Sequence, residues 1–278
     1  MQRLFALLCA AQAFAPLGLA QLANVQDPRD IVRRSVQRDY LNFERLKDYT
    51  YTQRNEERTF DKQGHLQKTE TETYDVLILG GHDYEKLTAR NDKPLSEKDA
   101  RKEQQKMDDE IARRERESAL DKAQLEKQRR ERRKFLDEVP DAFNFQLLGV
   151  EQVSGKPAWM ISAEPKPGYQ PKQRLAKVIE KLRGKIWIDQ ADYQWVKVEA
   201  DATGAISFGF GLLKIEPGAA LRFEQTRVND EVWLPASATI KASAREAFFK
   251  HIRTEVDMRF QTYRKFQADS QFVPLPAD

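Results

Sequence analysis

The sequence predicts an α+β protein that is mainly antiparallel β, with a long charged helical arm inserted at residues 96–138. Three observations predict this fold. Segments of alternating polar and apolar residues recur from residue 49 to 266, and most are joined by short turns, which favours an antiparallel meander. An amphipathic helix precedes them at residues 28–47. The inserted segment has no Gly or Pro and is dominated by charged residues.

The first 20 residues have the pattern of a secretory signal peptide. Arg3 supplies a positive n-region, an apolar run extends from Leu4 to Ala15, and Gly18 and Ala20 place small residues at a cleavage site. The apolar run is too short to span a membrane. We therefore expect an exported protein, periplasmic or secreted, whose residues 21–278 form a single domain that is soluble or peripheral to a membrane.

Composition excludes several classes of function. With 47 basic and 44 acidic residues, the formal net charge is +3, so the chain lacks the net basic surface of a dedicated nucleic-acid-binding protein. The one cysteine, Cys9, lies in the expected signal peptide, which leaves no disulfide and no cysteine ligand for zinc. The histidines, His65, His82 and His251, do not have the spacing of a metal motif. We therefore expect no metal, no cofactor and no catalytic residue.

The N-terminal elements are predicted to be a helix and three strands. Asp27 followed by Pro28 is a helix start, because Asp caps free N–H groups and Pro is tolerated at the first helical position. A run rich in Tyr and Thr then predicts a long hairpin with its turn at residues 61–64, and a third strand follows at 84–90. The apolar stripe of the helix is Val32, Val36, Tyr40, Phe43 and Leu46.

The inserted arm is interpreted as either one long helix or a coiled-coil-like helical hairpin. Its acidic and basic residues nearly balance and support helices in water through (i, i+4) pairs. Its sparse apolar residues form a poor packing stripe, so we expect the arm to project from the body or to cover one rim of the sheet. The basic run at 127–135 is expected to be a solvated face, with phosphate or an anionic membrane surface as the alternative.

The C-terminal half is predicted to be β structure with one short helix. A hairpin is expected at residues 143–165, and a helix at 174–184 is expected to end at Gly184. The following strands are expected at 185–190, 193–201, 205–215, 220–229, 232–242 and 250–266.

The last of these strands gives the clearest alternation. Such alternation indicates one dry face and one wet face, so the dry face of the sheet must lie under helices or be enclosed by curling. The residues that share the dry face are Ile252, Thr254, Val256, Met258, Phe260 and Thr262.

Two aspartates in "GKIWIDQADYQWVKVEAD", residues 184–201, have two interpretations. Asp189 and Asp192 suit either an acid/base pair or the ends of a turn between strands. We interpret them as turn residues that are exposed to water and ionise near their usual pKa. The glutamates on the first hairpin are expected to face solvent, so the sequence predicts a protein that is not an enzyme. These glutamates are Glu56, Glu57, Glu70 and Glu72.

The same stretch resembles the LolA/LolB/LppX superfamily of outer membrane lipoprotein-sorting proteins. The resemblance is best over residues 140–266 and includes "FGFGLLKIEPG" and "VNDEVWLPASATIKA". It implies a curved half-barrel sheet with helices over its concave face, an apolar cavity that carries or senses acyl chains, and no cofactor. The charged arm is a departure from that family. The matching residues are Gly184, Trp187, Ile188, Asp189, Val196, Val198 and Glu199.

Two functions follow as hypotheses. The first is an exported envelope protein that binds lipid or lipoprotein acyl chains, because each methylene group removed from water contributes about 0.8 kcal/mol. The second is a periplasmic interaction or scaffold protein that binds an envelope partner through residues 97–138. The dry-face residues suit a filled core as well as a cavity. The candidate cavity lining is Phe208, Phe210, Leu212, Val256, Met258 and Phe260.

Overall fold

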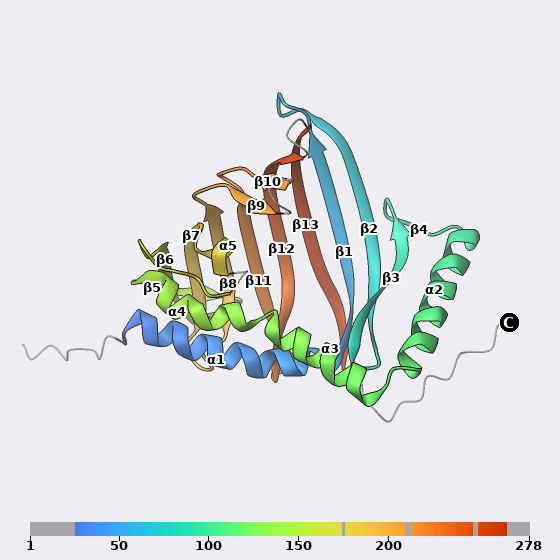
Figure 1. Cartoon of the computed structure of the whole chain (residues 1–278), viewed down its shortest axis with the longest axis horizontal. Helices are drawn as coiled ribbons and strands as arrows, with labels where there is room; N and C mark the ends of the chain where they lie inside the picture. The colour runs from blue at the N-terminus through green and yellow to red at the C-terminus, as the bar shows by residue number, and fades with distance from the viewer. Residues whose placement is uncertain (1–25, 174–175, 209–212, 247–249, 266–278) are drawn as a thin grey trace, which may run out of the picture.

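The structure is a computed structural model that describes residues 26–173, 176–208, 213–246 and 250–265. Its fold confirms the predicted class: an α+β chain with a large, curved, antiparallel sheet and helices over the concave face (Figure 1). The expected signal peptide, residues 1–20, lies outside the described residues and stays a prediction.

The N-terminal helix and hairpin form as their local sequence predicts. Asp27 caps the first helix by accepting from the Arg29 N–H at 2.9 Å. Asp61 shapes the first hairpin turn, since its Oδ1 accepts from the N–H groups of Gln63 and His65 at 2.9 and 2.8 Å. The elements are α1 (Pro28–Leu46), β1 (Tyr49–Phe60), β2 (Leu66–Leu79), β3 (His82–Arg90) and β4 (Lys93–Pro94).

The inserted arm contains two helices that fold back along the body. Ser118 starts the second helix with a capping box to Asp121, which breaks what would otherwise be one long helix. The first helix lies against β3, so the arm covers a rim of the sheet and does not project freely. The elements are α2 (Glu97–Glu115), α3 (Ala119–Glu131), the 3₁₀ helix η1 (Lys134–Glu138) and α4 (Val139–Ala142).

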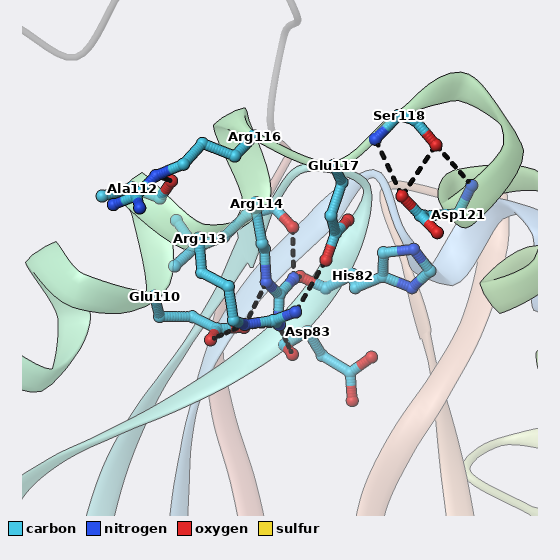
Figure 2. Close-up of polar contacts among 11 residues, drawn as sticks. His82, Asp83, Glu110, Ala112, Arg113, Arg114, Arg116, Glu117, Ser118 and Asp121 are labelled. Atoms are coloured by element: carbon cyan, nitrogen blue, oxygen red, sulfur yellow. Dashed lines mark hydrogen bonds and ion pairs between the residues drawn. The ribbon is translucent and has the colours of Figure 1, made fainter.

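Arg114 holds the end of α2 on the sheet. Figure 2 shows its guanidinium reaching the start of β3, where Nη1 donates to the His82 carbonyl at 3.1 Å and Nη2 to the Asp83 carbonyl at 3.4 Å. Nη1 also donates to the Leu79 carbonyl, and Nε donates to Glu110. One side chain on α2 therefore satisfies carbonyl groups at the β2–β3 turn.

The C-terminal half differs from the prediction in two places. Among the described residues of the helix expected at 174–184, α5 spans Ala176–Ile179, and Gly184 lies inside β7. The strand expected at 205–215 is a pair of short strands, β9 and β10. The other strands lie close to their predicted positions. The strands are β5 (Phe143–Val153), β6 (Lys156–Pro165), β7 (Leu182–Asp189), β8 (Trp195–Ala202), β9 (Ile206–Phe208), β10 (Leu213–Ile215), β11 (Ala220–Val228), β12 (Val232–Glu246) and β13 (Lys250–Lys265).

The physical reason for the strand at Gly184 is a close approach between two strands. A Cβ at this position would lie 1.9 Å from the carbonyl oxygen of Glu199 on β8, a distance that no side chain tolerates. The glycine therefore serves strand contact and does not end a helix.

In the described part of the chain, the sheet contains 13 strands and brings the first strand beside the last. Its order is β4-β3-β2-β1-β13-β12-β11-β8-β7-β6-β5, with β9 and β10 attached beside β12. Every pair is antiparallel, as predicted, but β1 pairs with β13, so the N-terminal hairpin and the last strand are neighbours. In the pairing of β1 with β13 the register shifts next to Thr262, which has a φ of +55°.

This bulge corrects the predicted dry face at its last residue. Thr262 is exposed, whereas the Tyr263 ring packs against Tyr51, 5.2 Å between centroids, and Tyr51 also contacts Phe260 at 6.0 Å. The bulge reverses the alternation, so that Tyr263 takes the place that Thr262 was expected to fill.

The concave face is defined by strand register. Ile186 pairs with Val198, Val198 with Phe223, and Phe223 with Ala238, so these side chains share one face across four strands. The main core lies where α1 covers this face at the β5–β8 end of the sheet. Its fully buried members are Ile31, Val32, Ile161 and Ile188.

Candidate functional site

A cavity of about 330 Å³ lies between α1, η1 and the concave face of the sheet. Its volume is at the lower end of the range for small-ligand pockets, about 300–1,000 Å³. The lining is almost wholly apolar. The apolar lining residues are Val32, Val36, Phe135, Leu136, Val139, Phe143, Phe145, Ala163, Ile179, Leu182, Ile186, Trp195, Val198, Ala200, Leu221 and Phe223.

Strand alternation and two helices position this lining. Phe143 and Phe145 alternate along β5 with the exposed Asn144, and Leu221 and Phe223 alternate along β11. Val32 and Val36 come from the stripe of α1, four residues apart, on the side that faces the sheet. Phe135 and Leu136, which also line the cavity, come from η1 at the end of the charged arm. The arm is thus part of the cavity and not an independent appendage.

A polar corner borders the cavity on α1. Asp39 is 3% exposed, and its Oδ1 accepts from Trp195 Nε1 at 2.8 Å and from Gln194 Nε2 at 3.4 Å. Its Oδ2 pairs with the Arg133 guanidinium. The carbon at the centre of that guanidinium lies 4.1 Å from the centre of the Phe43 ring, a cation–π contact. The buried carboxylate is therefore neutralised and hydrogen-bonded, as a buried charge requires.

Ser35 lies one helical turn before Asp39 and also borders the cavity. The residue is 1% exposed. In the described part of the chain, its Oγ has no hydrogen-bond partner. The Ser35 hydroxyl is therefore buried in α1, on the same side of the helix as Asp39.

The residues that the sequence suggested as cavity lining lie elsewhere or are not described. Val256, Met258 and Phe260 are half-buried on β13, on the concave face, but they are not among the described residues that line this cavity. Phe208 ends β9, and its side chain is outside the described part. Phe210 and Leu212 lie outside the described residues. A lining role for these six residues stays a prediction.

The cavity and the predicted strip are nevertheless neighbours on one face. Leu221, which lines the cavity, pairs with Ile240, and Ile240 pairs with Val256. The cavity residues themselves were visible in the sequence only as core signals: the α1 stripe and the alternation "FNF" in β5. Nothing in the charged arm indicated that Phe135 and Leu136 would close the space.

A second hollow lies farther along the concave face and is polar. Its volume is about 390 Å³. Glu72 accepts a hydrogen bond from the Tyr74 hydroxyl at 2.5 Å, and its carboxylate lies 3.1 Å from Arg90 Nε. These two contacts hold the pKa of Glu72 below its usual value. Burial, followed by the hydrogen bond to Glu72, raises the pKa of Tyr74 to about 12. The lining residues are Asn55, Glu57, Glu70, Thr71, Glu72, Arg90, Asn91 and Val256.

Asp189 and Asp192 are turn residues, as expected, but they are not exposed to water. Asp189 is 1% exposed, and its Oδ1 accepts from the N–H groups of Ala191 and Asp192 at 2.9 and 3.0 Å. Burial raises the pKa of Asp189. Asp192 accepts from Trp233 Nε1 at 2.8 Å and Arg227 Nη1 at 2.9 Å. The prediction of exposure was wrong: Asp189 is buried within its own turn, and Asp192 is held by Trp233 and Arg227 from neighbouring strands.

Two searches of the described residues gave negative results. Within residues 26–265, apart from the gaps given above, no three His, Cys, Asp or Glu side chains are grouped so as to hold a metal ion. In the same part of the chain, no helix is both long and apolar enough to cross a membrane.

No family model matches the sequence. No curated protein matches it. Solved structures do match it. One, a domain assigned to the outer membrane lipoprotein-sorting proteins from Vibrio parahaemolyticus, is 11% identical, with 87% of this chain and 95% of that chain covered and a TM-score of 0.33.

Two further matches have similar coverage. A LolA superfamily protein from Nitrosomonas europaea is 10% identical over 89% of this chain and 94% of that chain, with a TM-score of 0.32. A chain of the Pseudomonas aeruginosa MucA/MucB complex is 8% identical over 86% of this chain and 99% of that chain, with a TM-score of 0.25.

Proposed function

We propose that the protein is an exported, periplasmic protein that binds acyl chains of a lipid or lipoprotein without catalysis. The observation that carries the proposal is the cavity under α1 and η1. An acyl chain needs an apolar space, and each of its methylene groups gains about 0.8 kcal/mol when it leaves water. The phenylalanines and branched aliphatic residues of the wall provide that environment, and the single ionised side chain of the polar corner, Asp39, is already neutralised by Arg133.

The shape of the concave face supports the same function. The cavity wall at Leu221 continues into Ile240, which is 39% exposed, and then into Val256. An acyl chain longer than the cavity has an apolar path along the open face. The candidate residues Val256, Met258 and Phe260 belong to this path in the proposal.

Filling the cavity tests the proposal. Ala163 lies on its wall, so Ala163→Phe places a ring in the space an acyl chain would occupy. Binding of a fluorescent fatty acid, and any acyl species retained in native mass spectra, should fall at least tenfold. Ala100→Phe on the exposed side of α2 is the matched control and should bind as the wild type does. A wild-type protein that neither retains acyl species nor shifts the fluorescence would overturn the proposal.

A second candidate function is partner binding through the arm. One observation favours it: α3 has no buried residue, and Leu120 on this helix is 76% exposed. Because η1 lines the cavity, the test must spare residues after 131. Replacing 117–131 with a flexible linker of equal length should abolish capture of an envelope partner while the sheet remains folded. If all partner binding survives the replacement, α3 is not the binding element.

A further inference from the structure

We propose that the outer face of α1, together with the exposed cations of α3, docks the protein on the surface of an anionic phospholipid bilayer. The inference goes beyond the proposed function, because it concerns the side of α1 that faces away from the cavity and does not depend on acyl binding.

The first observation is a stripe of residues on α1 that points away from the sheet. Its members are spaced by four, three and four residues, so they share one side of the helix. Val32 and Val36 line the cavity from the opposite side of the same helix. The members of the stripe are Arg34, Arg38, Leu41 and Arg45.

The arginines of the stripe keep their charge unneutralised. Among the described residues, no carboxylate forms an ion pair with Arg34, Arg38 or Arg45. Arg34 donates to the Tyr193 hydroxyl at 3.1 Å, and Arg45 donates to the Glu231 carbonyl at 2.7 Å. Both acceptors are neutral groups, so the stripe presents three full positive charges.

The end of α3 brings further cations beside α1. The central carbons of the Arg129 and Arg133 guanidinium groups lie 4.0 and 4.1 Å from the centre of the Phe43 ring on α1. Figure 1 shows both helices at the lower end of the sheet. Lys127 and Arg132 are exposed here and, in the part of the chain that the structure describes, also have no carboxylate partner.

The charge of these helices is unbalanced, in contrast to that of α2. Together α1, α3 and η1 contain 12 basic and 8 acidic residues, and two of the acidic residues, Asp39 and Glu138, are buried. Helix α2 contains 6 basic and 7 acidic residues, and most of its cations pair within the helix, as Arg101 does with Glu97. A solvated, internally neutralised face therefore describes α2, whereas α1 and α3 present an excess of positive charge.

An exposed leucine within the stripe favours a bilayer as the anionic partner. Leu41 lies between Arg38 and Arg45 and is 61% exposed. At a bilayer surface, lipid phosphates meet the guanidinium groups, and a leucine among them reaches the boundary of the acyl region. Neither the apolar cavity nor the polar hollow is lined by the arginines of the stripe, so neither offers them a shaped site for a small anion. Docking would leave the cavity about one helix diameter, about 10 Å, from the lipid head groups.

Co-sedimentation with vesicles tests the proposal. The wild type should bind phosphatidylcholine vesicles that contain about 30% phosphatidylglycerol at least about tenfold more tightly than pure phosphatidylcholine, and the difference should shrink as salt rises from about 0.05 to 0.5 M. The neutral vesicles also report any binding by the apolar first 20 residues. The triple variant Arg34→Gln, Arg38→Gln, Arg45→Gln should bind the anionic vesicles about 10- to 100-fold more weakly.

A matched control removes the same charge from α2, which lies against β3 at the other end of the sheet. The triple variant Lys98→Gln, Arg101→Gln, Lys102→Gln should bind the anionic vesicles within about twofold of the wild type, because salt screens charges that lie far from the docked surface. If the α1 triple variant does not fold, Leu41→Ser changes an exposed side chain and should weaken binding by about 3- to 10-fold.

Four results would overturn the inference. They are no preference of the wild type for anionic over neutral vesicles, equal losses in the two triple variants, unchanged binding by Leu41→Ser, and release from the vesicles by inorganic phosphate at constant ionic strength. Tighter binding of the wild type to poly-glutamate than to anionic vesicles would also overturn it and would assign the surface to an acidic protein.

Discussion

The two halves of the concave face are built on the same alternation but have different chemistry. At the β5–β11 end, the inward residues are apolar, among them Phe145, Ile186 and Phe223, and α1 with η1 covers them. At the β1–β3 end, the inward residues include Asn55, Glu57 and Glu72, which line an open polar hollow. The comparison teaches that strand periodicity determines which face a residue occupies, whereas residue type decides whether that face is covered by helices.

The difference has a physical cause in the cost of burial. Covering an apolar face with a helix stabilises the folded state by about 25 cal/mol for each Å² of apolar surface removed from water. Polar side chains on the same surface would lose their hydration under a helix unless each found a partner. The chain therefore places its amphipathic helix over the apolar half, and its charged helix α2 lies beside the polar half, where it contacts β3.

The largest expected change in the free energy of unfolding comes from removing a carboxylate in the half of the sheet that helices cover. Asp39→Ala leaves Arg133 without its partner and Trp195 Nε1 without its acceptor. Removing one member of a buried ion pair costs about 3–5 kcal/mol, and Arg133 is partly exposed, so we expect about 3 kcal/mol. Urea unfolding followed by tryptophan fluorescence measures it.

Glu57→Ala in the polar hollow is the control for Asp39→Ala. Substitutions at solvated surface positions change stability by about 0.5 kcal/mol or less. If the two alanine variants lose equal stability, the two halves do not differ in solvation as their residues indicate.

The next prediction compares the same substitution, valine to asparagine, in the two halves of the concave face. Val198 lines the cavity and Val256 borders the polar hollow, and both are half-buried on the concave face. Val198→Asn puts an unpaired amide into the apolar cavity, which costs about 2–3 kcal/mol with the lost burial. Val256→Asn places the amide beside polar side chains, and we expect less than about 1 kcal/mol. Urea midpoints at constant m-value check the difference, and equal midpoints would contradict it.

Much of the fold could be predicted from the sequence because its signals are local. The Asp27 cap, the hairpin turn at Asp61 and the alternation of β13 each act within a few residues. The pairing of β1 with β13 could not be predicted, since strand order depends on contacts between distant segments. Gly184 was assigned to a helix end because its need for close strand contact appears only when β8 lies beside β7.

The candidate site was less predictable for a related reason. The alternation that produces a filled core is the same as the alternation that lines a cavity, so residues 252–260 satisfied both descriptions. The actual cavity depends on η1, whose Phe135 and Leu136 lie in a strongly charged segment. Phe135 and Leu136 line the cavity because η1 packs against the body of the protein, and no local sequence pattern predicts that contact.

The smallest expected effect concerns pH, and it has opposite signs at two carboxylates. Burial raises the pKa of Asp189, so ionisation of this side chain disfavours the folded state. The contribution of Asp189 to stability therefore falls as the pH rises from its ordinary pKa of 3.8 toward its raised pKa. The Tyr74 hydrogen bond and Arg90 lower the pKa of Glu72, so its contribution is present above the ordinary value of 4.5 and is lost as the pH falls through the lowered one.

Two amide variants isolate these contributions. Asp189→Asn keeps an oxygen for the Ala191 and Asp192 N–H groups, so its stability relative to the wild type should improve as the pH rises from about 3 to 7. Glu72→Gln should become less stable than the wild type over the same range, because the wild type gains the bond to Arg90. Each change should stay below about 1 kcal/mol. Urea unfolding at several pH values measures both, and a stability difference between Asp189→Asn and the wild type that does not change with pH would contradict the raised pKa of Asp189.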